Sequence, residues 1–403
     1  MTHAGDLVIT GLGVVSAIGL GAPAFADALF AGAARFAVLA RPGRQLDTTF
    51  IGAELPALPA PARGAPRQLR TASLTAHAAL VVLDEAWHDA GLDAVPGERI
   101  GLIVGGSNLQ QRELAEVRDR PQFLRPSYGM AFLDTDVSAL CTEAYPIRGL
   151  AHTLGGASAS GQLAVIEAAE AVAAGRVDAC IAIGALMDLS HWELRGLQAM
   201  GAMAPARCAA APDDACRPFD AARCGFVFGE ASAAVVIERR DRRPRGRAPY
   251  AALTGWAIEL DGARSPQPSL AGEVAAIRRA LGRAGLTPAD IAYINPHGTA
   301  SPLGDPLELS ALRACELGHA RVNATKALTG HGLTAAGAVE VVATALQLRA
   351  RRLHPTRNLT SPIDPDLRWV GPRAVDAEVG HALSLSIGFG GITTALCLRA
   401  EAA

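Results

Sequence analysis

Lysine is almost absent from this chain, and aromatic residues are scarce. Of the 37 lysines and arginines among 403 residues, 36 are arginines, and Lys326 is the only lysine. Aromatic residues make up 4% of the chain, so the core must be built mainly from alanine, valine, leucine and isoleucine. The net charge of -2 excludes the broad basic field that is typical of nucleic-acid-binding proteins. The hydrophobic content of 50% excludes a disordered chain.

Segments for export and membrane insertion are also missing, as are disulfide and zinc motifs. The N-terminus lacks the basic start, apolar stretch and cleavage site of a signal peptide. No run reaches the roughly 18 to 20 apolar residues of a membrane-spanning helix. The 7 cysteines are odd in number and form no CxxC pair, which argues against a disulfide framework or a bound zinc ion. We therefore expect a cytoplasmic protein that contacts neither membrane nor nucleic acid and binds no metal.

The chain does contain a regular alternation of short apolar strands and amphipathic helices. Strands are expected at 7–10, 99–106, 178–186, 225–239, 253–259, 291–294, 382–388 and 393–398, and helices at 71–90, 158–174, 271–285, 303–315 and 335–352. Such alternation predicts an α/β protein with a mostly parallel sheet in each of two halves, 1–240 and 250–403. The arginine-rich stretch 239–247 should be a surface connection between them.

The first candidate site is the run of small residues 155–161 at the start of an expected helix. Small residues allow close backbone approach, and a helix N-terminus stabilises a developing oxyanion. Serine is also a favoured helix N-cap, and the local sequence alone favours that interpretation. The hydrolase elbow G-x-S-x-G does not fit, because the glycines are misplaced around Ser158 and Ser160. The dinucleotide fingerprint, the Walker A loop and the H-E-x-x-H pair are all missing.

Two further candidates lie in the second half of the chain. His297 follows an expected strand and precedes a glycine, with Asp305 and Glu308 beyond it; it could face a cleft or be an ordinary loop histidine. Lys326 and His331 lie in a glycine-flanked loop before a helix. A chain that uses arginine at every other basic position should also use it on its surface. Lys326 therefore indicates a site that requires either a compact ammonium or an amine whose pKa burial can lower.

Motifs spread over nearly the whole chain resemble those of β-ketoacyl-acyl carrier protein synthases, the condensing enzymes with the thiolase fold. In chain order these motifs are 8–13 (VITGLG), 217–220 (RPFD), 225–230 (GFVFGE), 297–305 (HGTASPLGD), 325–331 (TKALTGH) and 388–391 (GFGG). Several spaced motifs in the right order make the resemblance specific. It implies a thiolase-like α/β fold in which two similar βαβαβαββ halves form a five-layered αβαβα core, and a homodimer.

The resemblance also assigns roles to individual residues. The implied catalytic residues are Ser158 in the N-terminal half and, in the C-terminal half, His297, Lys326 and His331. The implied supporting acidic residues are Asp305, Glu308 and Glu340. Phe389 is implied as a gate whose N–H forms an oxyanion hole with that of Ser158, and a phosphopantetheine arm is implied to contact Thr299 and Ser301. No bound cofactor is implied, because the phosphopantetheine arm of a carrier protein carries the substrate.

An acidic acyl carrier protein should dock on basic residues. The positions that match the family's docking residues are Arg63, Arg67, Arg70 and Arg207. Ordinary solvated arginines are the alternative interpretation of these four side chains.

One residue departs from the family, because Ser158 stands where its nucleophilic cysteine should be. A thiol, with a pKa of about 8.5, supplies some thiolate near neutral pH, whereas a hydroxyl ionises far less readily. Condensation should therefore be crippled. Decarboxylation of a malonyl thioester needs no nucleophile, because two imidazoles can stabilise the enolate oxygen while Lys326 helps to hold them as donors.

The run 155–162 (GGASASGQ) is similar to the serine-containing, ketosynthase-like decarboxylases of polyketide β-branching. Those enzymes convert malonyl-carrier protein to acetyl-carrier protein, which feeds an HMG-CoA-synthase-like enzyme. Two alternatives stay open. Ser158 could be a true nucleophile in an acyltransferase or slow condensing enzyme. The chain could also be a non-catalytic partner, like chain-length-determining subunits, although these typically lose both histidines.

Overall fold

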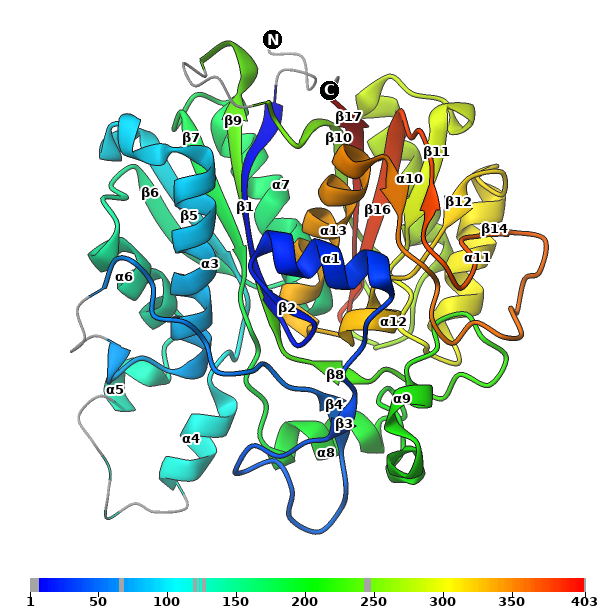
Figure 1. Ribbon diagram of the computed structural model, residues 1–403, viewed down its shortest axis with the longest axis horizontal. Coiled ribbons are helices and arrows are strands. Elements are labelled where there is room, and N and C mark those ends of the chain that lie inside the picture. The colour runs from blue at the N-terminus through cyan, green and yellow to red at the C-terminus, as the bar shows by residue number, and fades with distance from the viewer. Residues whose placement is uncertain are drawn as a thin grey trace.

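The computed structural model of the protein describes residues 7–64, 69–118, 122, 124, 128–242 and 248–401. Within these ranges twelve strands form one sheet, in the order β14-β12-β11-β16-β17-β10-β1-β9-β7-β5-β6, with β2 paired to β1 (Figure 1). The long strand β1 (Leu7–Ser16) lies near the middle of this order. Its first residues, 7–9, pair antiparallel with β10 (Ala251–Leu260), and this short contact joins the two halves of the sheet.

Strand directions in the sheet are mixed, so the expectation of a mostly parallel sheet in each half is wrong. The remaining strands are β2 (Gly19–Leu20), β5 (Ile100–Gly105), β6 (Leu150–Leu154), β7 (Ala179–Gly184), β9 (Ala231–Arg239), β11 (Ile291–Asn295), β12 (Arg321–Val322), β14 (Arg368–Trp369), β16 (His381–Gly388) and β17 (Ile392–Ala400). The outer strands of each half, β6-β5-β7 and β14-β12-β11-β16, run parallel. The inner ones, β7-β9-β1 and β16-β17-β10, are antiparallel. The turn 389–391 between β16 and β17 is too short for the crossover that parallel strands need.

Helices pack on both faces of each half-sheet and produce five layers. On the outside, α3 (Leu74–Ala90) packs on β1 and β9, and α10 (Leu270–Ala284) packs on β10 and β17. Between the half-sheets, α7 (Ser160–Ala173) and α13 (Ala336–Ala350) contact each other. Figure 1 shows α3 and α10 on opposite sides of the molecule. The order helix, sheet, helices, sheet, helix agrees with the expected five-layered core.

Helices α7 and α13 cross at two glycines, and this crossing positions the candidate site. A Cβ on Gly161 would lie 2.7 Å from the main-chain nitrogen of Ala338, and a Cβ on Gly337 would lie 2.7 Å from that of Gln162. Only glycine permits so close an approach. The crossing brings the N-terminal ends of both helices together, and Ser158 and His331 lie just before them.

The other elements surround this core. The remaining helices are α1 (Ala22–Ala31), α4 (Gln111–Arg118), α5 (Tyr128–Ala131), α6 (Thr135–Ala144), α8 (His191–Ala199), α9 (Pro212–Ala215), α11 (Gly304–Ala314) and α12 (Lys326–Thr329). Two small sheets contain β3 (Ala37–Val38), β4 (Ile51–Ala53) and β8 (Phe228–Gly229), and β13 (Arg352–Leu353) and β15 (Val375–Asp376). No helix of the described ranges is both long and apolar enough to cross a membrane.

Each strand and helix expected from the sequence has a counterpart within a few residues of its expected bounds, and β1 extends six residues further than expected, to Ser16. The expected surface connection 239–247 is described as far as a short 3-10 turn, Arg240–Arg242, and 243–247 lie outside the described residues. The division into halves 1–240 and 250–403 stays a prediction.

Candidate active site

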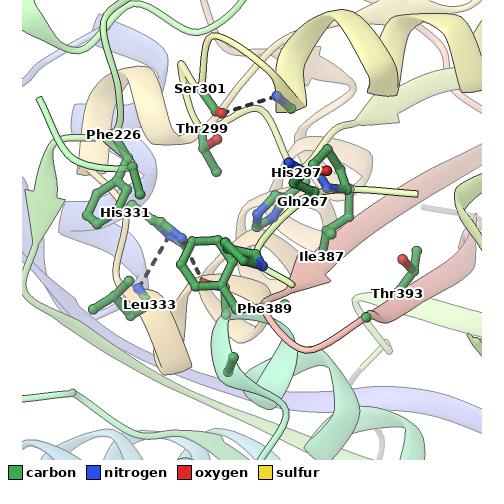
Figure 2. Close-up of a pocket in the computed structure, with 18 of the residues that line it drawn as sticks. Phe226, Gln267, His297, Thr299, Ser301, His331, Leu333, Ile387, Phe389 and Thr393 are labelled. Atoms are coloured by element: carbon green, nitrogen blue, oxygen red, sulfur yellow. Dashed lines mark hydrogen bonds between the residues drawn. The ribbon is translucent and has the colours of Figure 1, made fainter. Parts of the chain in front are cut away.

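A cavity of about 270 Å³ is lined by residues of both halves of the chain (Figure 2). The expected site residues on its wall are Ser158, His297, Thr299, Ser301, Asp305, Glu308, His331 and Phe389. Lys326 and Glu340 are not on this wall but are buried behind it. Lys326 contacts His297, and Glu340 contacts Lys326. The structure therefore brings together every catalytic and supporting residue that the family resemblance implied.

Ser158 lies in the tight turn Ala157–Ala159 that leads into α7. Neither this turn nor α7 is capped by a side chain, so the N-cap interpretation that the local sequence favours is wrong for Ser158. Ser160 stabilises the turn instead, because its Oγ accepts a main-chain N–H and donates to the carbonyl of Ala157. The half-buried hydroxyl of Ser158 is thereby left to contact His331.

His331 is oriented by a main-chain hydrogen bond that also fixes its tautomer. Its Nδ1 accepts the N–H of Leu333 at 3.3 Å, so the proton of the neutral ring lies on Nε2. That Nε2 lies 3.0 Å from Oγ of Ser158 and donates to it. The ring packs edge-on against Phe226, with 5.1 Å between the ring centroids. Burial and then the charge of Lys326 lower the pKa of His331 well below its ordinary value, which keeps the ring neutral.

His297 lies next to His331, with ring centroids 5.5 Å apart and ring planes at 84°. Nζ of Lys326 lies 3.4 Å from Nδ1 of His297 and donates to the His297 carbonyl at 2.5 Å. Because an ammonium can only donate, Nδ1 must accept, and Nε2 carries the proton. Burial, Lys326 and His331 hold the pKa of His297 well below its ordinary value. Both imidazoles are thus neutral rings with a proton on Nε2.

Lys326, the single lysine, is only 2% exposed and pairs with the buried carboxylate of Glu340. Burial raises the pKa of Glu340 to about 7, and the charge of Lys326 opposes this rise. The ammonium bridges Glu340 and the His297 loop within hydrogen-bond distance of both. A guanidinium is larger and planar, and it would crowd this enclosed space.

Asp305 and Glu308 hold the loop that carries His297. Glu308 accepts the N–H groups of His297 and Gly298. Asp305 accepts three main-chain N–H groups, those of Phe219, Thr299 and Ser301. Burial raises the pKa of both carboxyl groups, that of Asp305 to about 7. These contacts position the loop, which turns at Gly298 with a φ of 42° that glycine adopts freely and other residues rarely do.

Phe389 lies in the turn between β16 and β17, and it is 41% exposed on the cavity wall. A Cβ on Gly388 would lie 2.2 Å from the main-chain oxygen of Gly156, so this turn packs directly against the turn of Ser158. The hydroxyl of Ser386, on β16, also donates to the carbonyl of Ser158 at 3.3 Å. The proposed gating and oxyanion roles of Phe389 stay predictions, with this close packing in their favour.

The four expected docking arginines have different surroundings. Arg63 donates to the carboxylate of Asp93 at 2.6 Å and stacks over two aromatic rings. Arg70 and Arg207 are exposed. Arg67 lies outside the described residues. Docking of a carrier protein at these positions stays a prediction.

Some contacts of the site leave no signal in the sequence. Any residue type could supply the main-chain N–H with which Leu333 fixes His331. Phe226 lies in a motif that was recognisable, but its edge-on contact with His331 was not. Within the described part of the chain, no group of three histidine, cysteine, aspartate or glutamate side chains is placed to hold a metal ion.

Comparisons with known proteins identify the family. The chain matches the β-ketoacyl synthase N-terminal domain over residues 4–243 and the β-ketoacyl synthase C-terminal domain over residues 250–360. A relative from Bacillus subtilis (strain 168), the polyketide biosynthesis malonyl-ACP decarboxylase PksF, is 53% identical over 98% of this chain and 96% of its own length.

Two solved structures are similar to the whole chain. A β-ketoacyl synthase from Burkholderia phymatum STM815 superposes with a TM-score of 0.88 at 27% identity, over 98% of this chain and 100% of that one. A ketosynthase complex with its type II polyketide acyl-carrier protein, AntDE:AntF, superposes with a TM-score of 0.85 at 25% identity, over 98% of this chain and 99% of that one. The expected fold and family resemblance are confirmed, and the chain belongs to the β-ketoacyl synthase family.

Proposed function

We propose that this protein decarboxylates malonyl-acyl carrier protein to acetyl-acyl carrier protein in polyketide biosynthesis. The Bacillus subtilis relative is named for malonyl-ACP decarboxylation in polyketide biosynthesis, and its similarity covers 98% of this chain. The observation that carries the proposal is the hydrogen bond between His331 and Ser158, taken together with the tautomer of His331.

His331 acts as a donor to Ser158 and not as its base. Its Nδ1 is occupied by the N–H of Leu333, so its Nε2 donates to the serine oxygen. A hydroxyl that keeps its proton is a weak nucleophile. Attack of Ser158 on an acyl thioester is the first step of both condensation and acyl transfer, and the geometry disfavours it.

The two imidazoles supply what decarboxylation needs. A malonyl thioester oxygen that displaces the Ser158 hydroxyl from His331 can accept Nε2–H groups from His331 and His297. Loss of CO2 breaks the bond between the carboxylate carbon and the α-carbon, and the electron pair passes to the α-carbon and the thioester oxygen as an enolate. Donors that meet this charge as it develops stabilise the transition state. The α-carbon then takes up a proton from solvent, which gives the acetyl thioester.

The Lys326–Glu340 pair keeps this arrangement in the required protonation state. The ammonium disfavours protonation of both rings, so each ring remains a neutral donor. Its positive charge also favours the nearby enolate. Glu340 holds the ammonium in place.

The partners follow from the same reaction. The phosphopantetheine arm of the carrier protein contacts Thr299 and Ser301 on the cavity wall, and the acetyl product supplies an HMG-CoA-synthase-like enzyme for β-branching. We also propose a homodimer, because among the described residues the strand β6 ends the sheet, is partly exposed and presents an unpaired edge to a second copy. All seven cysteines are free thiols, which supports a reducing, cytoplasmic location.

Mass spectrometry of the intact carrier protein tests the proposal. Malonyl-carrier protein incubated with the enzyme should lose the mass of one CO2, and His297→Ala should convert it far more slowly. Carrier protein that keeps its malonyl group with the wild-type enzyme would contradict the proposal, as would equal conversion by His297→Ala. An acyl group trapped on Ser158 would support the nucleophile alternative instead.

A further inference from the structure

Arg223 joins two segments next to the cavity wall. It lies in the stretch between α9 and β8 and reaches the loop 300–303, where its Nε donates to the carbonyl of Ser301 at 3.1 Å and its Nη2 to that of Pro302 at 3.0 Å. Its Nη1 donates to the carbonyl of Asp220 at 3.1 Å. Ser301 itself lines the cavity (Figure 2), so the guanidinium lies within hydrogen-bond distance of the wall.

These contacts leave part of the donor capacity of Arg223 unused. A guanidinium has five N–H groups, and the three hydrogen bonds go to main-chain carbonyls, which carry no net charge. One N–H on each of Nη1 and Nη2 therefore remains, and paired N–H groups of this kind bind a phosphate oxygen pair well. The Arg223 side chain is half-buried, and Leu303, which follows Pro302 in the loop, is 66% exposed, so solvent reaches this part of the loop.

The charges around Arg223 make it a distinctive feature of the cavity. Asp261, Asp305 and Glu308 are the acidic residues on the wall. Burial raises the pKa of Asp305, and the charge of Arg223 opposes this rise, which indicates that the two groups lie near each other. Among the residues that the structure describes, Arg223 is the one arginine that hydrogen bonds to a residue of the wall. An anion that approaches this wall is disfavoured by the acidic groups and favoured by one adjacent guanidinium, that of Arg223.

We propose that Arg223 binds the phosphate of the phosphopantetheine arm while the malonyl end lies at His297 and His331. This inference rests on the proposed function. The thioester must reach the two imidazoles, so the arm extends outward along the loop that carries Thr299 and Ser301. The phosphate is the charged outer end of the arm. In this arrangement it reaches the part of the loop to which Arg223 hydrogen bonds.

Two malonyl thioesters that differ only in the phosphate test this assignment. The kcat/KM of the full chain is measured by CO2 release with malonyl-phosphopantetheine and with malonyl-pantetheine. The wild-type enzyme should prefer the phosphorylated thioester by about tenfold or more, the effect of a charge-assisted hydrogen bond. Arg223→Gln should abolish this preference, because it removes the charged donor to the phosphate. Any weakening of the loop would slow both substrates alike and leave the preference intact. Arg223→Lys, which keeps the charge without the fork, should retain part of it.

Arg264 provides a matched control, because it is exposed and lies three residues beyond Asp261 of the wall, whereas the guanidinium hydrogen bonds to the 300–303 loop come from Arg223. Arg264→Gln should keep the full preference. A wild-type enzyme that uses both thioesters equally overturns the inference, and this result needs no variant to fold. Equal losses on both substrates in Arg223→Gln also overturn it, because they indicate a purely structural role. Decarboxylation of neither thioester nor of malonyl-carrier protein would mean that the proposed function itself fails.

Discussion

The two halves of the chain contribute very different surfaces to one cavity. The N-terminal half provides Ser158, a half-buried hydroxyl that receives a single hydrogen bond from across the cavity. The C-terminal half provides two imidazoles with fixed tautomers and a buried lysine–glutamate pair behind them. A buried charge pair is costly unless it is fully oriented, whereas a neutral hydroxyl costs little. The difference supports the proposal that the histidine side carries the chemistry and that the Ser158 hydroxyl is secondary.

Removing an imidazole from the histidine side should cause the largest loss of activity. His331→Ala deletes one of the two N–H donors that meet the enolate oxygen, and we expect kcat for malonyl-carrier protein to fall about 10²- to 10³-fold. Initial rates of CO2 release measure the effect. Comparable activity in wild type and His331→Ala would show that the histidine side does not stabilise the enolate.

Lys326→Arg tests whether the histidine side needs a compact ammonium as well as a positive charge. Added volume at this buried position should lower the free energy of unfolding by about 1–3 kcal/mol and displace the His297 loop. We expect decarboxylation to drop about tenfold, since misplaced donors stabilise the enolate less. Thermal denaturation and CO2 release are measured on the same preparation.

The matched control for this variant is the reverse exchange at an exposed arginine, Arg279→Lys, which should leave both quantities unchanged. Normal activity and stability of Lys326→Arg would mean that the single lysine is an accident of composition.

The pH dependence separates charge from shape on the histidine side. In the wild type, burial and Lys326 lower the pKa of both rings well below 6.5, so the acid limb of kcat that the rings produce should lie well below pH 6.5, apart from any limb near pH 7 from Glu340 or Asp305. Lys326→Met removes a positive charge that repels a protonated ring, so both pKa values should rise. The acid limb of a pH–rate profile should then move to higher pH, toward 6.5. A limb that stays in place or moves to lower pH would argue that Lys326 does not control the rings.

The smallest effect is expected on the other half. Ser158→Ala removes a neutral acceptor from His331, a hydrogen bond worth about 1 kcal/mol, and the substrate oxygen takes its place in the complex. Decarboxylation should therefore change by about fivefold or less. Loss of nearly all turnover in this variant would show that Ser158 takes part in the chemistry and would favour the acyltransferase alternative.

The fold and most of the cavity could be predicted from the sequence, for identifiable reasons. Periodicity located the main elements, because the apolar residues that face the core recur with one repeat in helices and with another in strands. Lys326 was recognisable because it is the only lysine, and the two histidines because they lie in motifs of fixed spacing. The family resemblance then supplied supporting residues such as Glu340, which no local pattern marks.

What escaped prediction depends on the main chain and on long-range packing. A serine before a helix is an N-cap by local rules, but here Ser160 performs the stabilising contact and Ser158 is left for the cavity. The short connection 389–391 does indicate that β16 and β17 are antiparallel, but β9 pairs antiparallel with β1 and β7, which are distant in the sequence, and periodicity does not report such pairings. Arg223 gave no signal, since its partners are carbonyl groups that every residue possesses.

The burial of the only lysine gives this protein an unusual property for proteolysis. An endoproteinase that cleaves solely after lysine has one target in the whole sequence, the bond between Lys326 and Ala327, and both residues are buried. The native chain should resist such an enzyme, because cleavage requires this segment to open. Each cut yields only the fragments 1–326 and 327–403, so their rate of appearance measures how often the segment beside His297 unfolds, without any label or engineered site.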